Sequence, residues 1–469
     1  MYQPHPQSKA AYKLLHDGVL ALGRAEQRGI RLDLKYCHAE TERLTREIKA
    51  LEQAFHHTKF YRHWFKTLGG RTPNINSNAQ LGNFLYKRKK LKPIKTTVTG
   101  QGSTDEEALL QLNIPELNDL LRLRGLKKIR DTYLKGFLKE QVGGRVHPNF
   151  NLHIARTYRS SSDRPNFQNI PKRDEEAKRI CRQALFPSKG YQLMAVDYSG
   201  IEVCVSACYH QDPTMMKYIK DPKSDMHRDM AQQVYELKTY DPSITGHKVL
   251  RSAAKNGFVF PQFYGDYYRN CAISMACNWG KLPDGRWKPG QGIPLGDGSL
   301  SDHLLGQGHK SLEQFADHVQ RIEKDFWGRR FRVYARWKEK TWEQYQRTGY
   351  VELLTGFRCG GLMAYNDVTN YPIQGAAFHC LLKAFVLADR ELRARKFKTR
   401  LIGQIHDEMI LDVWPPELDE VGELLLDVMT QQVPEEWPWI VVPLTVDMEV
   451  SPVDGSWQEM GSYVRDARK

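Results

Sequence analysis

Two carboxylates lie where short apolar stretches become polar, and they are the residues best placed to bind metal. Asp197 follows residues 191–196, whose apolar pattern predicts a buried strand. Asp407 lies in the polar centre of residues 401–413, where alternating apolar and polar residues predict a β-hairpin. Carboxylates that converge from two strands can hold the two divalent ions that serve phosphoryl transfer to a hydroxyl group. A single Asp in such a place is more often a turn or strand-end residue than a metal ligand. Other parts of the sequence must therefore decide whether these two residues bind metal.

Helical periodicity surrounds these two segments. Residues 8–56 predict two helices with a break at Gly29-Ile30. Between them, residues 30–33 predict a short turn in which Asp33 is the N-cap of the second helix. The two carboxylate-bearing segments therefore belong to a mainly helical chain.

A basic segment follows these helices. Residues 69–104 are rich in Gly, Thr, Asn and Lys and predict an exposed loop that carries the basic run 87–90. A capping-box pattern at residues 104–107 predicts a return to helix through residue 140. Helices that carry a basic loop indicate a clamp along a phosphate backbone.

Length and charge point to a globular protein with a polyanionic partner. The 469 residues have a net charge of +14, no apolar run long enough to cross a membrane and no secretory signal, so we expect a soluble cytoplasmic protein. Residues 1–140 hold 26 Lys and Arg against 14 Asp and Glu, whereas residues 404–469 hold 3 against 15. This asymmetry favours nucleic acid as a partner, although a solvated basic face is an equally good interpretation of charge alone. The eight cysteines show no paired C-x-x-C spacing and are expected to be reduced packing residues.

Five segments, in order along the chain, are similar to signature motifs of the family A DNA polymerases. Residues 197–202 (DYSGIE) resemble motif A, residues 251–265 resemble motif B and residues 406–408 (HDE) resemble motif C. Residues 157–171 (TYRSSSDRPNFQNIP) and 372–375 (PIQG) resemble two further family motifs. The resemblance covers nearly the whole chain, which we expect to be the polymerase domain alone of a phage-type family A enzyme.

The resemblance implies a right-hand polymerase of palm, fingers and thumb, an α+β fold that is mainly helical with an antiparallel palm sheet. Residues 1–145 are then expected to be N-terminal helices and thumb, 146–208 the first part of the palm, 209–349 the fingers and 350–469 the second part of the palm. Since the proofreading exonuclease domain of the family would precede residue 1, we expect none in this chain.

The resemblance also assigns the metal site. Asp197, Asp407 and the backbone carbonyl of Tyr198 would hold two Mg²⁺ ions, for which Mn²⁺ can substitute. Glu408 would be a further catalytic carboxylate, and a solvated acid at the hairpin tip is an equally good interpretation of it. Glu202 resembles the family's steric gate, which selects dNTPs over NTPs.

A second group would bind the incoming nucleotide. Arg251 and Lys255 are four residues apart, hence on one helix face, where they would hold the triphosphate, and Lys255 would also be catalytic. His227 would touch the same phosphates, and Phe260 and Tyr264 would lie near the templating base pair. An exposed cationic helix face and a packing histidine are the alternatives.

A third group would contact DNA. Arg159, Asn370, Gln374 and His406 match family positions that contact the minor groove of the primer–template, where correct base pairs present similar acceptors. For Asn370 and Gln374, helix-surface amides that bond to solvent are the alternative.

The spacing in motif B departs from that of the family. Lys255 and Phe260 are five residues apart instead of four, which at about 100° per residue turns the aromatic ring off the cationic face of a straight helix. Because Gly257 and Pro261 lie there, we expect a one-residue π-bulge or kink that restores the register. Without such a bulge or kink, Val259 and Phe263 would lie on the cationic face instead.

Two further departures concern single residues and an added segment. Gly200 and Cys204 replace the usual Gln and Arg, so contacts made there by relatives are in question. Residues 270–310 exceed the family's length and predict an insertion in the fingers, turn-rich over 280–310. A zinc site could be sought there, in Cys271, Cys277, His303 and His309, but their irregular spacing favours an ordinary surface loop.

The sequence therefore predicts a DNA-templated DNA polymerase that acts on primer–template DNA and dNTPs in the cytoplasm of a bacterial or phage-infected cell. Replisome proteins or a separate exonuclease are possible further partners. The alternatives are an enzyme similar to the single-subunit RNA polymerases, against which Glu202 argues, and a catalytically silent DNA-binding replisome protein.

Overall fold

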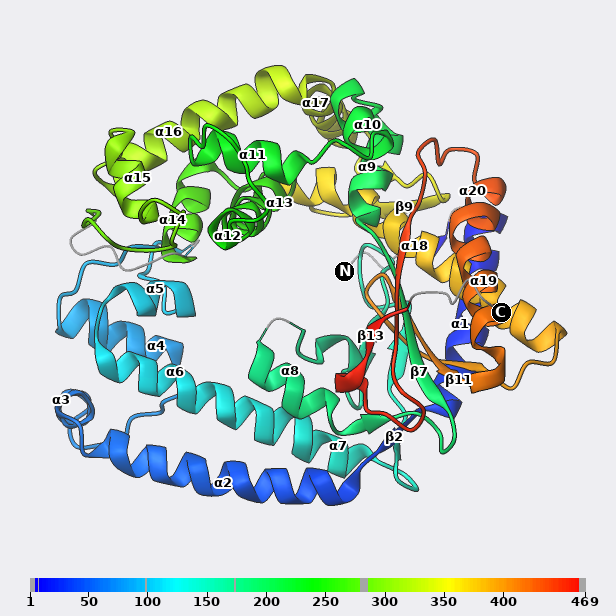
Figure 1. Ribbon diagram of the computed structural model, residues 1–469, viewed down its shortest axis with the longest axis horizontal. Coiled ribbons are helices and arrows are strands. Elements are labelled where there is room, and N and C mark those ends of the chain that lie inside the picture. Colours follow the sequence, from blue (N-terminus) through cyan, green and yellow to red (C-terminus); the bar gives the residue numbers. More distant parts are fainter. Residues whose placement is uncertain (1–4, 7, 98, 173, 279–285, 464–469) are drawn as a thin grey trace. The chain divides into compact units, whose positions relative to one another are not determined.

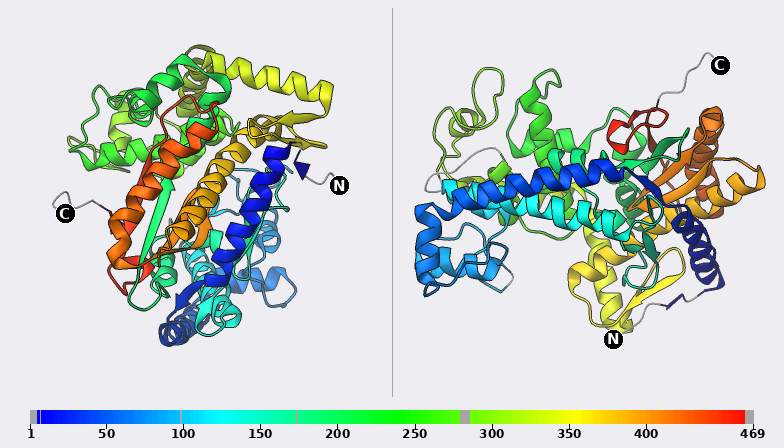
Figure 2. Two further views of the ribbon diagram at one scale, coloured as in Figure 1. Left: turned by 90° about the vertical axis from the view of Figure 1, so that its right-hand side faces the viewer. Right: turned by 90° about the horizontal axis from the view of Figure 1, so that it is seen from below.

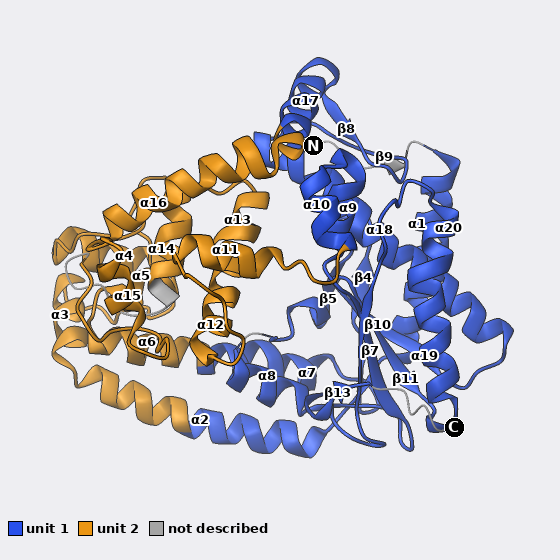
Figure 3. Cartoon of the chain, turned by 45° about the horizontal axis from the view of Figure 1, so that its top comes forward, with its two compact units in different colours: residues 1–46, 126–220, 336–469 blue, residues 47–125, 221–335 orange. Residues whose placement is uncertain are grey.

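The computed structural model describes residues 5–6, 8–97, 99–172, 174–278 and 286–463. Helices predominate, and every strand pair among these residues is antiparallel (Figure 1). The chain divides into two compact units (Figure 3). Unit 1 takes residues 1–46, 126–220 and 336–469, and unit 2 takes residues 47–125 and 221–335. The expected boundaries of thumb, palm and fingers stay a prediction.

A five-stranded sheet forms the centre of unit 1. Its strand order is β10 (Arg400–Ile405), β11 (Glu408–Val413), β7 (Gln192–Tyr198), β12 (Val446–Val450) and β13 (Gly461–Ser462). Residues 193–196 of β7 are apolar and buried on both faces, as a central strand requires. The predicted strand and the predicted hairpin are both confirmed.

Long helices pack against this sheet. α1 (Lys9–Arg28) contacts β10 and runs beside α18 (Tyr365–Ala394), which also contacts β10 and β11 (Figure 2). Gly375 lets α18 approach the segment 157–171 closely, because a Cβ at that position would lie 2.5 Å from the Thr157 carbonyl oxygen. α18 is thereby held against the segment 157–171.

The other elements of unit 1 connect these layers. Ser8 caps α1, and Asp33 accepts a hydrogen bond from the amide of Tyr36 at 2.9 Å at the start of α2 (Leu34–His56), which confirms the predicted break and cap. The predicted turn at 30–33 is wrong, because Ile30–Leu32 forms strand β2 between β3 and β6. The remaining elements are η2 (Lys128–Leu134), α7 (Lys135–Glu140), β3 (Arg145–Val146), β4 (Asn149–Asn151), β5 (Ser161–Asp163), η3 (Phe167–Asn169), α8 (Glu175–Arg182), β6 (Leu185–Phe186), α9 (Ile201–His210), α10 (Pro213–Lys220), β1 (His5–Pro6), β8 (Tyr350–Glu352), β9 (Phe357–Gly360), η7 (Pro415–Glu417), α19 (Leu418–Asp427), η8 (Val428–Gln432), α20 (Val433–Glu436) and η9 (Trp457–Glu459).

Unit 2 is helical. Its elements are the end of α2, α3 (Lys59–Thr67), α4 (Asn78–Gly82), η1 (Asn83–Arg88), α5 (Glu106–Gln111), most of α6 (Pro115–Lys127), α11 (Met226–Val234), α12 (Thr245–Ala254), η4 (Lys255–Val259), α13 (Phe260–Phe263), α14 (Tyr268–Asn278), α15 (Leu300–Gly306), α16 (Leu312–Asp325), η6 (Phe326–Arg330) and the start of α17 (Arg332–Thr348). The predicted return to helix after residue 104 is confirmed, with Asp105 as the N-cap of α5.

Two loop predictions in unit 2 are wrong in part. Residues 78–88 are helical, because Leu81, Phe84 and Leu85 are buried and need a helix to share one face. In the turn-rich segment, residues 300–306 form α15, which begins with a capping box of Ser299 and Asp302. Residues 279–285 of that segment lie outside the described residues.

Cysteine usage agrees with the expectation of reduced packing residues. The seven cysteines whose side chains are described are free thiols and are buried, whereas the side chain of Cys277 lies outside the described residues. Among the helices that the structure describes, none is long and apolar enough to cross a membrane.

Candidate active site

Three adjacent strands of the unit 1 sheet place acidic residues side by side. Asp197 on β7 is paired in register with Glu408 on β11 and with Asp447 on β12. Residues directly opposite each other in antiparallel strands have side chains on the same face of the sheet. Asp407 directly precedes β11, and its carbonyl accepts a hydrogen bond from the amide of Tyr198 at 3.3 Å. The sheet therefore brings the two predicted carboxylates to one end of the β7–β11 pair.

The hairpin turn that carries Asp407 is held from outside. His406 has a positive φ of 53°, and its carbonyl accepts a hydrogen bond from the side chain of Gln404. The Gln404 side-chain oxygen accepts hydrogen bonds from Ser160 Oγ at 2.6 Å and from Gln168 Nε2 at 3.0 Å. The segment 157–171 thus fixes the turn from which His406 and Asp407 project.

The carboxylates resist ionisation in this arrangement. Partial burial, together with the charge on Asp407, raises the pKa of Asp197 to about 6. Burial also raises the pKa of Asp407 and that of Glu408, whose side chain is buried. The alternative interpretation of Glu408 as a solvated hairpin acid is therefore wrong. The Oδ1 atom of Asp197 is buried and accepts no hydrogen bond from the residues that the structure describes.

Lys172 is a functional candidate that sequence reasoning missed. Its Nζ lies 3.4 Å from Asp197 Oδ2 and 3.5 Å from Glu408 Oε2. Partial burial alone would lower the pKa of Lys172, but the charges of Glu408 and Asp197 outweigh it and the pKa is raised. Its place directly after the motif 157–171 was the one signal in the sequence that could have found it.

These residues line a cavity of about 630 Å³. Asp447 lies in its wall and accepts a hydrogen bond from Ser199 Oγ at 2.7 Å. Arg182 is buried there with its guanidinium 5.0 Å from the ring of Trp457. The lining of the cavity is rich in charged residues, and no sequence pattern had indicated Arg182 or Asp447.

Glu202 and Arg159, which were predicted to have different roles, form an ion pair. Arg159 Nη2 lies 2.6 Å from Glu202 Oε1, with Glu202 in the first turn of α9. The pKa of His406 is lowered by desolvation and by the charges of Arg159 and Lys172. The charge of Glu202 raises the pKa of Asp407 and that of Arg159 lowers it, so the ion pair and Asp407 are electrostatically linked.

Asn370 and Gln374 lie in the first third of α18, around Pro372. Asn370 is buried, so the alternative interpretation as a solvent-bonded surface amide is wrong for this residue, whereas Gln374 is partly exposed. Contact of both residues with DNA stays a prediction.

In unit 2, the predicted nucleotide-binding residues form a second cluster. Arg251 Nε bonds to Asp225 Oδ2 at 2.7 Å. Lys255 Nζ lies 5.3 Å from the centre of the Phe260 ring, and the His227 ring meets the same ring edge-on at 5.7 Å. Burial, Lys255 and Arg251 lower the pKa of His227 to about 4, which keeps its imidazole neutral. The predicted residues are neighbours, and their substrate stays a prediction.

The expected π-bulge is present. Lys255–Val259 forms the π-helix η4, and the amide of Phe260 bonds to the carbonyl of Lys255 five residues back. Val259 is buried, and Phe263 packs against Phe326 in an aromatic core with ring centres 5.5 Å apart. By contrast, Tyr264 is 44% exposed. The bulge therefore keeps Phe260 with Lys255, as predicted, and the arrangement with Val259 and Phe263 on that face is wrong.

The residues considered for zinc have other environments. Cys271 is buried in α14, and His303 Nε2 bonds to the Tyr235 carbonyl at 2.7 Å. His309 is also buried and bonds to Glu236, so it does not belong to an ordinary surface loop. The side chain of Cys277 lies outside the described residues.

Comparison with known proteins identifies similar chains. The sequence profile described as DNA polymerase family A matches residues 35–277 and 307–459, and the interruption falls inside the predicted insertion. The DNA polymerase I of Geobacillus stearothermophilus is 28% identical over 452 residues, which are 93% of this chain and 44% of that relative. The DNA polymerase I of Lactococcus lactis is 30% identical over 386 residues, which are 81% of this chain and 39% of that relative. The chain thus spans less than half the length of these curated relatives.

A solved structure has a similar fold. The POL domain of Pol1 from M. smegmatis, in complex with DNA primer-template and dNTP, superposes with a TM-score of 0.71 at 24% identity. The match covers 94% of this chain and 70% of that chain.

Proposed function

Because the chain belongs to DNA polymerase family A, we propose that it extends a primer 3′-hydroxyl with dNTPs, directed by a DNA template. The observation that carries the proposal is the convergence of Asp197, Asp407 and Glu408 at one end of the β7–β11 pair. Paired carboxylates on strands are what a two-metal phosphoryl transfer requires. We place the activity in the cytoplasm, where DNA is accessible in the bacteria that carry the relatives.

The family uses divalent metal ions, and the residues present fit Mg²⁺. Among the residues that the structure describes, Asp197 Oδ1 is buried without a hydrogen-bond partner, and Lys172 is the cation that forms ion pairs with Asp197 and Glu408. Carboxylate oxygens are the ligands that Mg²⁺ prefers. Asp197 and Asp407 would hold two ions, with the Tyr198 carbonyl as a further ligand, and Mn²⁺ would substitute. When bound, such ions lower the pKa of an attacking hydroxyl and neutralise the charge of a leaving pyrophosphate.

The remaining residues bind and select. In unit 2, Arg251 and Lys255 would bind the triphosphate of a dNTP by charge-assisted hydrogen bonds, and the neutral His227 would donate another. Phe260, beneath the Lys255 ammonium group, and Tyr264 would contact the nascent base pair.

In unit 1, the Glu202 carboxylate, oriented by Arg159, would occupy the space that a ribose 2′-hydroxyl needs. Arg159, His406, Asn370 and Gln374 would contact the minor groove.

Primer extension with Mg²⁺ tests the proposal. Asp197→Asn and Asp407→Asn should each slow extension by on the order of 10²–10³-fold, since each would weaken the binding of the metal ions that stabilise the charge of the transition state. Primer–template affinity should change little, because it depends on phosphate contacts. Asp412→Asn is the matched control: this acid is buried near the other end of β11 and accepts a hydrogen bond from the Ser188 amide at 2.9 Å, so extension should be retained. Wild-type protein that binds primer–template without extending it would support the silent DNA-binding protein instead.

The choice of sugar separates the DNA polymerase from the RNA polymerase alternative. The wild-type protein should incorporate dNTPs in strong preference to NTPs. Glu202→Ala should raise NTP incorporation relative to dNTP incorporation, because it removes the side chain that excludes the 2′-hydroxyl. Equal use of both nucleotide sets by the wild-type protein would favour the RNA polymerase-like enzyme.

A further inference from the structure

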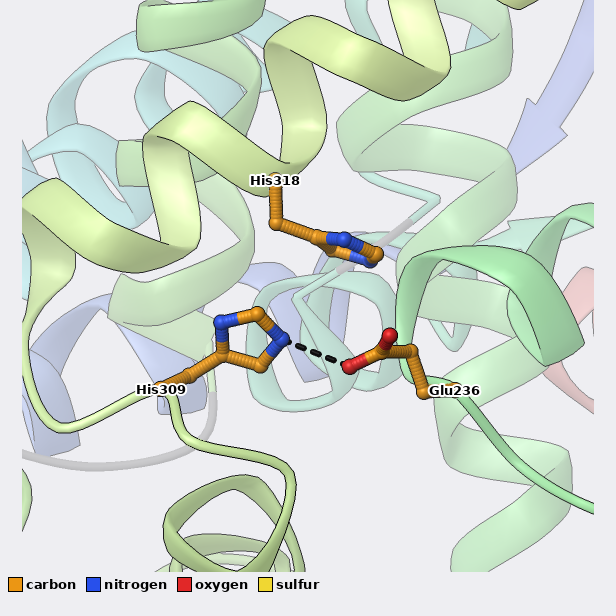
Figure 4. A group of neighbouring side chains, drawn as sticks. All are labelled: Glu236, His309 and His318. Carbon is orange, nitrogen blue, oxygen red and sulfur yellow. Dashed lines mark hydrogen bonds and ion pairs between the residues drawn. The ribbon is translucent and has the colours of Figure 1, made fainter.

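A cluster of three potential metal ligands lies in unit 2, outside the residues proposed above to bind Mg²⁺, dNTP or DNA. Glu236, His309 and His318 each present one ligand atom, and these atoms lie within 4.8 Å of one another (Figure 4). His309 Nε2 is 2.6 Å from Glu236 Oε2, and the ring centres of His309 and His318 are 4.8 Å apart. Both histidines are buried, whereas the Glu236 side chain is 37% exposed. The cluster is therefore enclosed by protein and reachable from solvent at the carboxylate.

Separate elements hold these three residues in place. Glu236 follows α11 with a positive φ of 50°, His309 lies between α15 and α16, and His318 lies in α16. The amide of His309 bonds to the Leu304 carbonyl at 2.9 Å, which ties it to α15. His318 Nε2 donates to the Gln233 carbonyl at 3.2 Å, since a carbonyl can only accept. A second ring nitrogen that is bonded to a backbone carbonyl is the usual support of a metal-binding histidine.

We propose that Glu236, His309 and His318 bind a divalent transition-metal ion, with Zn²⁺ as the best fit. Two imidazoles and one carboxylate suit Zn²⁺ better than Mg²⁺, which prefers oxygen ligands alone. Tetrahedral binding at about 2.0–2.1 Å requires donor atoms about 3.3 Å apart. The 2.6 Å separation of His309 Nε2 from Glu236 Oε2 is shorter than this value, and all three ligand atoms lie within 4.8 Å of one another. Small side-chain rotations would therefore bring the three ligand atoms to tetrahedral spacing. Water would complete the four ligands on the exposed side.

The position of the cluster indicates a structural role. The family match stops at residue 277 and resumes at residue 307, two residues before His309. Metal binding would therefore anchor the end of the unmatched segment to α16 and to the segment that follows α11. Phe315 lies beside His309, with ring centres 6.1 Å apart, and provides an apolar wall that favours stable binding. The ion would act as a cross-link in unit 2, separate from the carboxylate cluster of unit 1.

Metal titration of the chelator-treated chain tests the proposal. Zn²⁺ alone is added in the presence of millimolar Mg²⁺, which occupies carboxylate sites but competes poorly for imidazole. We expect one Zn²⁺ per chain by elemental analysis, a higher Tm with Zn²⁺, and, with Co²⁺ as the probe, the visible absorption of a four-coordinate ion. Absence of stoichiometric Zn²⁺ under these conditions would overturn the proposal without any variant.

Variants locate the site. His309→Gln and His318→Gln should each weaken Zn²⁺ binding by at least about 100-fold, since each removes a ligand. His303→Gln is the matched control, because His303 lies in α15 nearby but bonds to the Tyr235 carbonyl and is not in the cluster. It should bind Zn²⁺ as the wild type does, and Asp197→Ala, which alters the carboxylate cluster, should do so as well. Zn²⁺ binding that persists in the double variant of His309 and His318, or that disappears equally in His303→Gln, would contradict the assignment.

Discussion

The two oxygens of Asp197 have different environments, and this difference explains how the site is prepared for cations. Oδ2 lies 3.4 Å from the ammonium group of Lys172, whereas Oδ1 is buried and has no hydrogen-bond partner in the described part of the chain. A buried oxygen of this kind is costly to keep ionised, which is why the pKa of Asp197 is raised to about 6. The folded chain thus holds a site whose electrostatic cost a bound cation relieves.

The raised pKa makes metal-free stability depend on pH with a definite sign. Between about pH 4 and about pH 6 the folded state keeps a proton on Asp197 that the unfolded chain has released. Its contribution to the free energy of unfolding is therefore greatest below about pH 4 and is lost as the pH rises through about 6. We expect the Tm of the metal-free wild type, relative to that of Asp197→Asn, to fall over this range. Mg²⁺ should remove the fall, and a difference in Tm that rises with pH would contradict the assignment.

Lys172 should compete with the metal for the carboxylates. A unit charge at about 4 Å in a water-like medium is worth about 1 kcal/mol, or about fivefold in affinity. We therefore expect Lys172→Met to lower the Mg²⁺ concentration that gives half-maximal extension by about fivefold, measured by titration at saturating dNTP. Lys172→Arg, which keeps the charge, is the control and should change the requirement little. A higher requirement in Lys172→Met would show instead that Lys172 helps to hold the substrate.

At the scale of elements, the π-helix η4 shows how an added residue is absorbed without loss of geometry. Lys255–Val259 takes up one residue more than the family spacing, so Phe260 stays beside Lys255. Gly257 is suited to this place, because a Cβ there would lie 2.5 Å from Met275 Cγ. The bulge therefore accommodates both the extra residue and close packing with α14.

Removal of the extra residue should be tolerated. Deletion of the exposed Asn256 would leave Lys255 and Phe260 four residues apart in an α-helix, which keeps them on one face. We expect the deletion to leave the KM for dNTP within about threefold of the wild type. Insertion of Ala after Asn256 is the control, and it should raise KM by about tenfold or more, because the ring would turn by about 100°. Equal damage by deletion and insertion would show that the bulge itself is required.

The same elements show what sequence patterns can and cannot predict. The four apolar residues before Asp197, the hairpin around Asp407 and the five-residue spacing after Lys255 are local signals, and each predicted its structure. Asp447 could not be found in this way, because its place beside Asp197 depends on the pairing of β12 with β7. Lys172 and His318 were missed because their partners lie far away in the sequence. The helix at 78–88 was missed because its polar composition hides three buried apolar residues.

At the scale of the whole molecule, the charge is distributed along the chain in a way that suits a polyanion. The first 140 residues carry 26 cationic against 14 anionic side chains, and the last 66 carry 3 against 15. Lys87, Arg88 and Lys90 are exposed in the cationic part. Residues in a basic surface run of this kind are expected to contact phosphates and to release counterions when DNA binds.

Salt dependence should show this directly. If six to ten phosphates are contacted, primer–template affinity should fall by about 10³–10⁵-fold between about 50 and 200 mM salt. Replacement of Lys87, Arg88 and Lys90 by Ala should lower the slope of log affinity against log salt by up to about 3, at about 0.9 for each phosphate that is no longer neutralised. The control is the replacement of three other arginines by Ala, which removes the same amount of charge: Arg390, Arg393 and Arg395. Each of them already forms an ion pair, with Asp17, Asp389 and Glu391 respectively, so the slope should not change. Equal changes in both variants would mean that net charge, and not the basic run, governs binding.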